Sequence, residues 1–516
     1  MTYTTLRTAL IAGVSLLTMA GAANAQTSAD AEARIAALEA QLAALSGQIA
    51  DLKAATAASL KEVRAAPAAP AVTTAATTTV SLSNGRPTIA TSDGAFSASF
   101  RGFFQADAAI YDQRDAGPLS TDFRRGSFGD AAENDRARDM SDGVNVRRAR
   151  IGMEGKVFSV FDYNMVYDFG GSGVEEAGKI SSAWLQYSGY PVKVRVGFFP
   201  APTSLEDASS FTGSLFVERA SVAETVRGLA GGDGRGGVGL TASGERWNLA
   251  ATVTGNTVTT LTYDEQIGFV GRAAYVPFKG KDWLIHVGAN ANLVIDPAAS
   301  GPDVASAGGA VTNVRLRDRP ELRVDGTRLI DTGNIDADGV TALGLELGGQ
   351  IKNVYAQGEY FNIDVERRNS ALSDPKFDGW YVQAGWTLTG EPRRYNTATA
   401  GFDNPRPAKP FNPKKAQWGA VELAARYSTF DLNHLAGGPG TPTLPGAIRG
   451  GEQNIVSLGL NWYLNNVVMV SGAYRNVEVR RLSPGGTAFG AGATPAAGTQ
   501  VGQDLDIWSL RTQYVF

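Results

Sequence analysis

The chain has 516 residues, no cysteine, two histidines and a formal net charge of −4. Without cysteine there are no disulfides, thiolate metal sites or cysteine nucleophiles, and two histidines are too few for most histidine-based metal sites or a catalytic triad. The near-balanced charge argues against a nucleic-acid-binding protein. We therefore expect neither an enzyme nor a protein that holds a metal or cofactor.

Residues 1–25 have the organisation of a secretory signal peptide. Arg7 supplies a positive charge, an apolar segment follows, and Ala23-Asn24-Ala25 has the small residues typical of a cleavage site. The alternative is a short membrane anchor, but the apolar segment is too short to span a bilayer. We expect an exported protein.

Residues 26–64 repeat apolar residues at alternating steps of three and four, as in a coiled-coil helix. The seam consists of Ile35, Leu38, Leu42, Leu45, Ile49 and Leu52. Such a helix needs a partner helix, so the pattern predicts self-association, with the number of helices left open. The alternative is a single amphipathic helix that lies on the rest of the protein or on the cell wall.

Residues 65–79, AAPAAPAVTTAATTT, form a Pro/Ala/Thr-rich stretch without periodicity, which predicts a linker. A domain boundary is expected near residue 80. After the N-terminal segment, no run of about 18 apolar residues marks a transmembrane helix. A membrane protein with this sequence would therefore cross the bilayer with strands.

From residue 80 to 516 the chain alternates apolar and polar residues with a period of two, as strands do. In 146–169, for example, Ile151 and Met153 alternate with Arg150 and Glu154. The same alternation recurs in 192–198, 380–388, 456–463 and 508–516. A soluble β-sandwich would bury the apolar face, whereas a membrane barrel turns it to lipid and the charged face to a wet lumen.

Two further features favour the barrel. Aromatic residues gather at the ends of the alternating strips, as membrane-interface girdles require. Short links such as 464–466 contrast with long ones such as 296–340 and 390–417, which predicts short turns at one end and long loops at the other. The length of the region predicts an all-β, transmembrane, antiparallel barrel of about 15 to 17 strands, which is wide enough for an aqueous channel.

Several segments resemble the phosphate-selective porin O and P family. They are 147–171 (RRARIGMEGKVFSVFDYNMVYDFGG), 194–220 with RVGFFPAPTSLED and LFVERA, 379–396, 419–433 and 450–466, together with the C-terminal Phe516. The resemblance implies a 16-stranded barrel in the outer membrane of a Gram-negative bacterium that assembles as a homotrimer. It also implies arginines along the lumen and a loop folded inward to narrow the pore.

The stretch that matches the constriction loop, 201–237, departs from the phosphate-selective members, which carry lysine there. It has no lysine, and its three arginines are outnumbered by five acidic residues. The candidate constriction residues are Glu206, Asp207, Glu218, Arg219, Arg227 and Arg235; Glu224 and Asp233 are the remaining acids. This difference predicts weak anion preference and little block by phosphate.

A set of basic residues falls on the polar faces of the predicted strands. The candidate pore-lining residues are Arg101, Arg148, Arg150, Lys193, Arg195, Arg426, Arg475 and Arg511. They would guide anions, because a wet pore lined with one sign of charge concentrates counter-ions. Alternatively they pair with Asp107, Glu154, Asp168, Glu359 and Glu422 and brace the barrel. For the set as a whole, we expect some anion bias.

Three other features receive structural interpretations. The arginines of 313–329 form a cluster that would suit phosphate or carboxylate, but pairing with Asp318, Glu321 and Asp325 or contact with lipid head groups is expected. His286 is predicted to face the lumen without a catalytic role. The Asp-rich stretch 331–339 lacks the spacing of a calcium loop.

The sequence therefore predicts a passive outer-membrane channel for small anionic or polar solutes, surrounded by outer-membrane lipid. One alternative narrows the solute to phosphate or polyphosphate. Another makes the protein an envelope tether, with the coiled coil in contact with the cell wall and the barrel as its anchor.

Overall fold

The computed structural model describes residues 77–83, 85–113, 140–171, 178–209, 212–258, 265–299, 312–368, 371–485 and 495–516, with seven helical residues between 40 and 54. The predicted signal peptide, the coiled-coil seam and the linker as far as residue 76 lie outside the described residues. The chain divides into one unit of residues 1–75 and another of residues 76–516, and the second unit is described below. Among the described residues, no helix is both long and apolar enough to cross a membrane.

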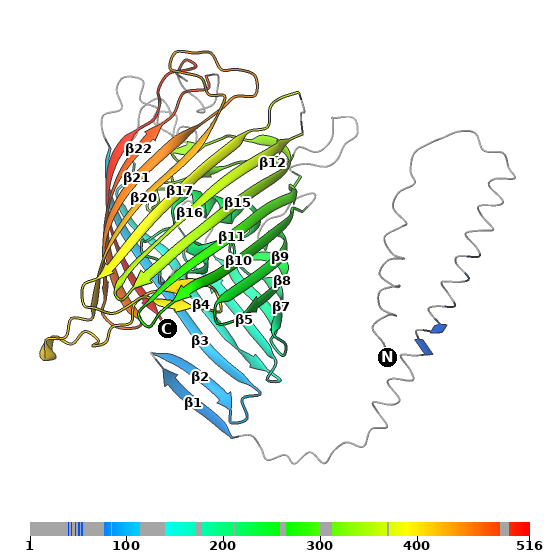
Figure 1. Ribbon diagram of the computed structural model, residues 1–516, viewed down its shortest axis with the longest axis vertical. Helices are drawn as coiled ribbons and strands as arrows, with labels where there is room; N and C mark the ends of the chain where they lie inside the picture. The colour runs from blue at the N-terminus through cyan, green and yellow to red at the C-terminus, as the bar shows by residue number, and fades with distance from the viewer. Residues whose placement is uncertain are drawn as a thin grey trace. The chain divides into compact units, whose positions relative to one another are not determined.

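Sixteen of the described strands form a closed antiparallel barrel (Figure 1). They are β3 (Ser97–Gln113), β4 (Gly143–Val157), β5 (Phe161–Asp168), β6 (Lys179–Tyr187), β7 (Val192–Phe198), β8 (Arg235–Ser243), β9 (Trp247–Thr257), β10 (Ile267–Lys279), β11 (Trp283–Asp296), β15 (Ile335–Ile351), β16 (Val354–Arg367), β17 (Lys376–Thr387), β20 (Ala420–His434), β21 (Ile448–Tyr463), β22 (Val468–Arg480) and β23 (Asp504–Val515). Each pairs with the next, and β23 pairs with β3. The predicted barrel of about 16 strands is confirmed.

Shorter elements surround or fill the barrel. They are the hairpin β1 (Thr78–Ser83) and β2 (Arg86–Thr91), the strands β12 (Asn313–Val314), β13 (Arg317–Asp318), β14 (Ile330–Asp331), β18 (Arg394–Asn396) and β19 (Gly401–Asp403), the helices α4 (Leu205–Ala208) and α5 (Ser221–Ala230), and the 3-10 turn η2 (Pro413–Lys415). β2 pairs with the start of β3. β1 begins two residues before the predicted boundary at residue 80.

The C-terminus completes the closure of the barrel. Val515 pairs with Phe103, and the backbone N–H groups of Phe516 and Gly102 donate to each other's carbonyls at 2.9 and 3.1 Å. A side chain at Gly102 would place its Cβ 2.0 Å from the Phe516 ring. Glycine at this position therefore lets the terminal ring pack against β3.

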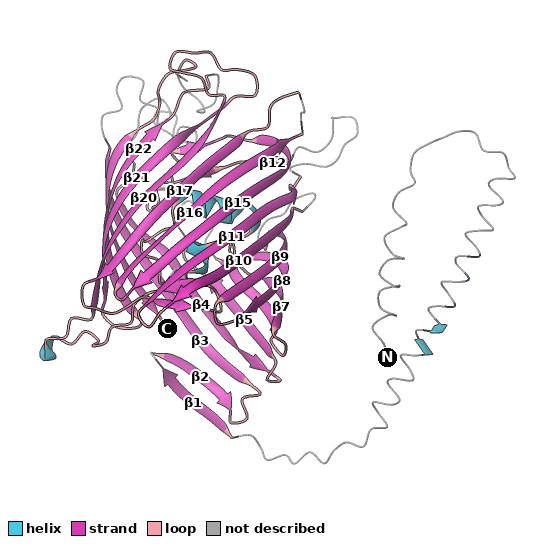
Figure 2. Cartoon of the chain, viewed as in Figure 1, coloured by secondary structure: helices cyan, strands magenta, loops and turns pink. Residues whose placement is uncertain are grey.

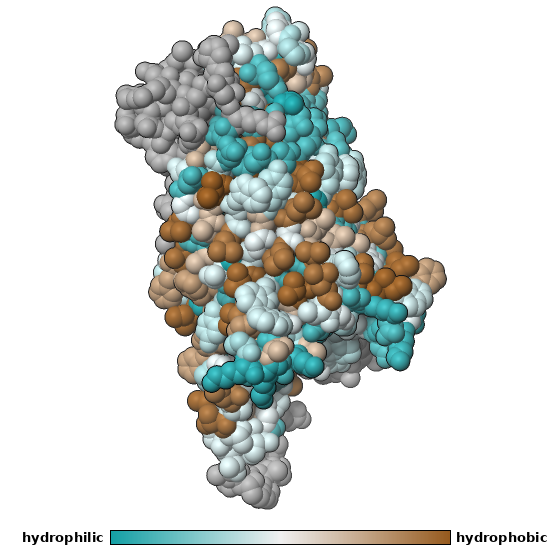
Figure 3. Space-filling model, turned by 90° about the vertical axis from the view of Figure 1, so that its left-hand side faces the viewer, coloured by the Kyte–Doolittle hydropathy of each residue, from teal (hydrophilic) through white to brown (hydrophobic). Residues whose placement is uncertain are grey.

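The two faces of the wall follow the predicted alternation. Ile151, Leu458 and Trp508 are more than half exposed to the outside, whereas Arg511 on the inner face of β23 is 1% exposed. Figure 3 shows apolar residues gathered over the middle of the strands, with hydrophilic residues toward both ends. An exposed apolar belt of this kind is the surface that lipid covers.

The connections alternate between the two ends of the barrel, with one exception. Short turns join β4 to β5, β10 to β11, β15 to β16 and β21 to β22. The link 388–419 between β17 and β20 lies at this same short-turn end, although it is long. The expectation that long connections share one end is therefore wrong here, because the strand order places the end of β17 beside the short turns.

Two connections fold into the barrel, 199–234, which carries both helices, and 312–334, and so does the part of 388–419 around Phe402. Figure 2 shows the helices inside the ring of strands, and α5 packs against β10, β11, β16, β17 and β20. Val222 and Val226 of α5 join a buried apolar cluster with inward-facing Phe361 and Phe430 of the wall. The inner face is thus partly apolar, because protein rather than water covers it.

Candidate functional site

The first inward segment, 199–234, is held to the wall by Glu359 of β16. The backbone N–H groups of Leu205 and Glu206 donate to the Glu359 carboxylate at 2.8 and 3.0 Å, and the Tyr381 hydroxyl donates to it at 2.7 Å. A carboxylate at the start of a helix accepts N–H groups that have no partner within the helix. Glu359 thereby fixes where the segment crosses the lumen.

Arg426 of β20 joins the wall to two inward segments. Its guanidinium donates to the Glu206 carboxylate at 2.5 Å and to the Glu321 carboxylate, in the 312–334 connection, at 3.0 Å. It also donates to the backbone carbonyl of Glu218 at 2.9 Å. Because Arg426 is 2% exposed, these bonds form away from bulk water, where charged hydrogen bonds are strong.

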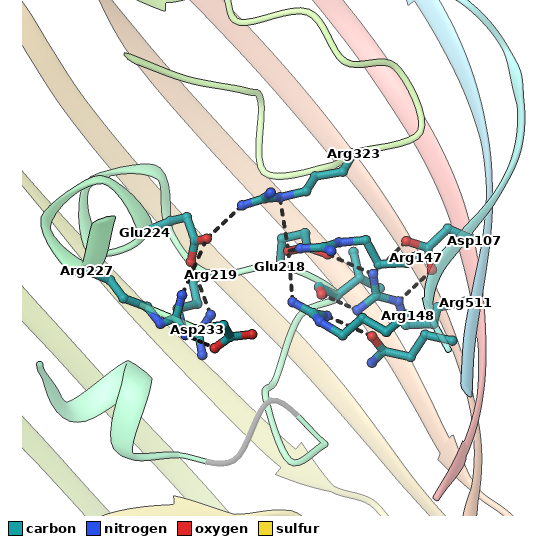
Figure 4. A network of polar contacts seen from close by, with 12 residues as sticks. Asp107, Arg147, Arg148, Glu218, Arg219, Glu224, Arg227, Asp233, Arg323 and Arg511 are labelled. Atoms are coloured by element: carbon teal, nitrogen blue, oxygen red, sulfur yellow. Dashed lines mark hydrogen bonds and ion pairs between the residues drawn. The ribbon is translucent and has the colours of Figure 1, made fainter. Parts of the chain in front are cut away.

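The carboxylate of Glu218 lies among four arginines (Figure 4). Arg147 donates to it through Nε and Nη2 at 2.8 and 3.2 Å, and Arg511 through Nη2 at 2.8 Å. Arg323 and Arg148 lie 3.6 and 3.9 Å from the same carboxylate. Burial disfavours the charged form, but the guanidiniums of Arg147, Arg148 and Arg511 outweigh it and hold the pKa of Glu218 well below its usual range.

The Glu218 cluster continues into one connected network of ion pairs inside the barrel. Its members are seven arginines (Arg147, Arg148, Arg150, Arg219, Arg227, Arg323 and Arg511) and six carboxylates (Asp107, Asp168, Asp207, Glu218, Glu224 and Asp233). Burial opposes the charge of Glu224, but Arg323, Arg219 and Arg227 lower its pKa to about 2. The network contains one more guanidinium than carboxylate, so with all groups charged it has an excess of one positive charge.

A cavity of about 250 Å³ with both charged and apolar lining adjoins the network along β3 to β7. Its lining includes Arg101, Arg150, Asp233, Trp184 and Arg195. The Arg195 guanidinium lies 4.1 Å from the centre of the Trp184 ring and donates to Gln186 at 2.7 and 3.0 Å. Solutes that cross this part of the lumen would meet both charges and aromatic surface.

The segment 388–419 approaches the constriction from the short-turn end. Arg393 donates to the Glu422 carboxylate of β20 at 2.7 and 2.8 Å and to the Gly213 carbonyl at 2.6 Å. Phe402 is fully buried in an apolar cluster that includes Leu205 and Tyr355. The two inward segments therefore pack against each other inside the barrel.

The predicted site residues separate into two groups. Arg148, Arg150, Arg511, Asp207, Glu218, Arg219 and Arg227 belong to the network, and Glu206 pairs with Arg426. Five predicted residues lie outside the network: Arg101, Lys193, Arg195, Arg235 and Arg475. Of these, Arg101 pairs with Glu154, and Arg475 donates to the Ser509 hydroxyl. Most of the predicted basic residues thus have carboxylate partners, as the bracing alternative expects.

Arg235 differs from its predicted place in the constriction loop. It is the first residue of β8, and its guanidinium donates to the carbonyls of Gly231 and Gly255 at 2.6 and 2.8 Å. The side chain therefore closes the end of the inward segment on itself instead of facing a solute.

Arg147 is a network member that the strict period of two assigns to the lipid face. The register of β3 and β4 shifts between Gln105 and Ala106, so that Arg147 has no opposite residue and turns inward beside Arg148. A β-bulge of this kind re-aims one side chain. The sequence did indicate this irregularity: two consecutive arginines in a strand would place one of them in lipid, which is energetically costly.

Two arginines of 313–329 pair with acids outside that stretch. Arg315 pairs with Asp331 at 2.7 Å, and Arg323 with Glu224 at 2.7 Å. Together with Arg317, Arg319 and Arg328 they line a cavity of about 250 Å³. Asp318 also borders this cavity, and burial raises its pKa to about 7. The connection is therefore folded against α5 by specific pairs.

His286 faces the lumen as predicted. Its ring nitrogens lie 2.8 Å from the Tyr395 hydroxyl and 3.2 Å from the Glu346 carboxylate, and the side chain is fully buried. The histidine therefore links β11 to the segment 388–419, which agrees with a structural role.

Known proteins resemble this chain in sequence and in fold. Porin O of Pseudomonas aeruginosa is 26% identical over 428 residues, which cover 80% of this chain and 90% of the relative. An anion-selective porin from Comamonas acidovorans is 12% identical, with a TM-score of 0.45 over 82% of this chain and 100% of that one. A loop-deletion mutant of OmpT, an outer membrane protein of Vibrio cholerae, is 11% identical, with a TM-score of 0.46 over 82% and 100%.

The family described as phosphate-selective porin O and P matches residues 123–516. This match covers most of the chain and nearly the whole barrel. The chain therefore belongs to the phosphate-selective porin O and P family and is a porin of the Gram-negative outer membrane.

Proposed function

We propose that this porin is a passive channel for small polar solutes with a weak preference for anions. The observation that carries the proposal is the constriction network, in which seven arginines face six carboxylates. A small excess of positive charge at the narrowest part of a pore favours anions without excluding cations. Selectivity here follows from wall charge and width, not from chemistry.

The same network argues against a deep phosphate trap. Its arginines already pair with protein carboxylates, and the stretch 201–237 contains no lysine. Carboxylates also repel a divalent anion more strongly than a monovalent one, since Coulomb energy scales with charge. Phosphate is therefore expected to permeate as one anion among several.

Reversal potentials in a potassium chloride gradient across a planar bilayer test this proposal. We expect a small potential of the sign for anion preference and a chloride current that millimolar phosphate leaves nearly unchanged. Cation selectivity, or strong phosphate block of the unmodified channel, would contradict it.

We further infer a homotrimer. The family match supports it. Cross-linking in intact outer membranes, followed by separation without heating, is expected to give a band of three chains. A single-chain band under these conditions would contradict the inference.

The tethering function remains a second proposal, supported by the heptad seam in residues 26–64. Deleting this segment is expected to leave a conducting barrel, because the strands close their hydrogen bonds without it. If it is a tether, the deletion would reduce co-purification of the porin with isolated cell wall. Unchanged co-purification would exclude the tether.

A further inference from the structure

We propose that the Glu218 carboxylate occupies an oxyanion-binding site of the constriction and thereby prevents this channel from trapping free oxyanions. Without that carboxylate, the four surrounding arginines would bind a tetrahedral oxyanion such as inorganic phosphate. The inference deepens the proposed function, since it names the residue that keeps the anion preference weak.

The geometry around Glu218 is that of a bound anion. Arg147 donates two hydrogen bonds to the carboxylate at 2.8 and 3.2 Å, and Arg511 donates a third hydrogen bond at 2.8 Å. Arg323 and Arg148 complete the ring at 3.6 and 3.9 Å. Bidentate hydrogen bonding by guanidinium groups is the arrangement with which proteins bind both carboxylates and phosphates.

None of the four guanidiniums belongs to the segment that carries Glu218, although Arg323 is held in part by Glu224 of that segment. Arg147 and Arg148 belong to β4, Arg511 to β23 and Arg323 to the 312–334 connection. Arg147, Arg148 and Arg511 are each less than a tenth exposed. The wall thus holds most of the site in place, and Glu218 is its occupant.

The charge balance shows what removal of Glu218 would leave. Arg511 also pairs with Asp107 at 2.6 Å, and Arg323 with Glu224 at 2.7 Å. Four guanidiniums would then face two carboxylates, an excess of two positive charges in a buried place. Uncompensated buried charge is costly, and phosphate, with a charge between −1 and −2 near neutral pH, would offset it.

In the natural chain the occupant is covalently attached. A tethered group has a high effective concentration at its site, on the order of millimolar or more. Free phosphate must compete with it, and so passes the constriction without long residence. The site is present but filled, which explains how arginines can line the pore without producing strong selectivity.

Three variants separate the effect of the site from that of net charge. Glu218→Ala removes the charge and opens the space. Glu218→Gln removes the same charge but keeps the space filled. Glu206→Ala makes the same change of charge and size at Arg426, which retains Glu321 at 3.0 Å as a partner.

We expect half-block of the chloride current by inorganic phosphate at a concentration at least about tenfold lower in Glu218→Ala than in the unmodified channel, as one charged hydrogen bond regained would give. Glu218→Gln and Glu206→Ala should shift the reversal potential toward anions without such a block. Equal phosphate sensitivity in all three variants would overturn the proposal.

A second measurement does not depend on conduction. A bound ligand raises the melting temperature of the state that it binds, so phosphate should raise the melting temperature, or the refolding yield in detergent, of Glu218→Ala alone. No phosphate effect on this variant would overturn the inference while leaving the channel proposal intact. An unmodified protein that does not conduct would contradict the channel proposal but leave this measurement valid.

Discussion

The two segments that narrow the lumen from opposite ends are held in different ways. The segment 199–234 enters from the long-loop end and is fixed by ion pairs, with Arg426 and Arg511 of the wall bound to Glu206 and Glu218. The segment 388–419 enters from the short-turn end and is fixed by the buried ion pair of Arg393 with Glu422 and by Phe402 in an apolar cluster. It also receives hydrogen bonds from Arg272 at the carbonyls of Thr399 and Ala400.

This difference assigns the two segments different effects on permeation. The segment 199–234 sets the charge that a solute meets, because its acids decide how many arginines remain uncompensated. The segment 388–419, whose Arg393 is paired with Glu422, contributes bulk and support beneath it. Changes to the first should alter selectivity and stability together, whereas changes to the second should alter conductance with little effect on ion preference.

The largest effect is expected from removing the charge of Arg426, which joins the segments 199–234 and 312–334 to the wall. Arg426→Met leaves Glu206 and Glu321 buried without their common partner, and breaking a buried pair costs about 3–5 kcal/mol. Denaturant unfolding in detergent, followed by tryptophan fluorescence, measures the loss. Arg101→Met is the matched control, because its pair with Glu154 is 44% exposed on the arginine side and should be worth about 1 kcal/mol or less.

Phe402→Ala tests the apolar attachment. The ring is fully buried and lies 4.8 and 5.1 Å from the rings of Tyr355 and Tyr395. Its removal should weaken docking of the segment by about 3–4 kcal/mol. Single-channel recordings should show larger or noisier currents with an unchanged reversal potential.

The control for this variant is Phe411→Ala, which makes the same change in size in the same segment at a half-buried ring beside Trp418 and Trp462. Its currents should resemble those of the natural channel. A shift in ion preference in Phe402→Ala would mean that the two segments do not act separately.

A charge on the lipid face should disturb the wall without acting on either segment. Leu458 is 54% exposed on the outside of β21, and Leu458→Lys is expected to cost about 2–4 kcal/mol near the bilayer midplane. The fraction of protein that stays folded in unheated detergent measures the loss. The same outcome is expected at Ile151 and Leu460.

Ser457 and Gln383 lie on the inner face but are buried against other lumen groups, so they are poor controls. Ser182, which lines the cavity along β3 to β7, is the better control for an added charge. Equal loss of folded protein in Ser182→Lys and Leu458→Lys would contradict the assignment of the two faces.

The smallest effect is expected from pH, at Asp318. Burial raises the pKa of this carboxyl to about 7, above its unfolded value of about 4. The folded state then binds the proton more tightly, so the contribution of Asp318 to stability is greatest below pH 4 and is lost as pH rises toward 7. Asp318→Asn should therefore stabilise the 312–334 connection at pH 8 more than at pH 4, as measured by limited proteolysis.

The wall was predictable from the sequence because each strand has one apolar and one polar face. Alternation placed Trp380 outside and Tyr381 inside without knowledge of any contact. The partners within the lumen were harder to predict from the sequence. Arg147 turns inward only because of a bulge, and Glu321 pairs with Arg426, 105 residues away, instead of a neighbour in its own cluster.

The end of the barrel at which 388–419 lies can be predicted only by counting strands, since its length alone suggests the long-loop end. Its docking depends on Phe402 meeting Leu205 and Tyr355, a set with no local pattern. Period-two patterning thus predicts surfaces, whereas the interior of this pore is decided by long-range pairs that the pattern does not encode.

The long link between β17 and β20 also bears on how the barrel assembles. These strands are neighbours in the sheet, but 32 residues separate them, against two between β15 and β16. Each doubling of a loop costs about 0.6 kcal/mol of closure entropy, so this sixteenfold difference costs about 2.5 kcal/mol. Pairing of β17 with β20 is therefore expected late in folding, once Phe402 and Arg393 have docked and shortened the effective loop.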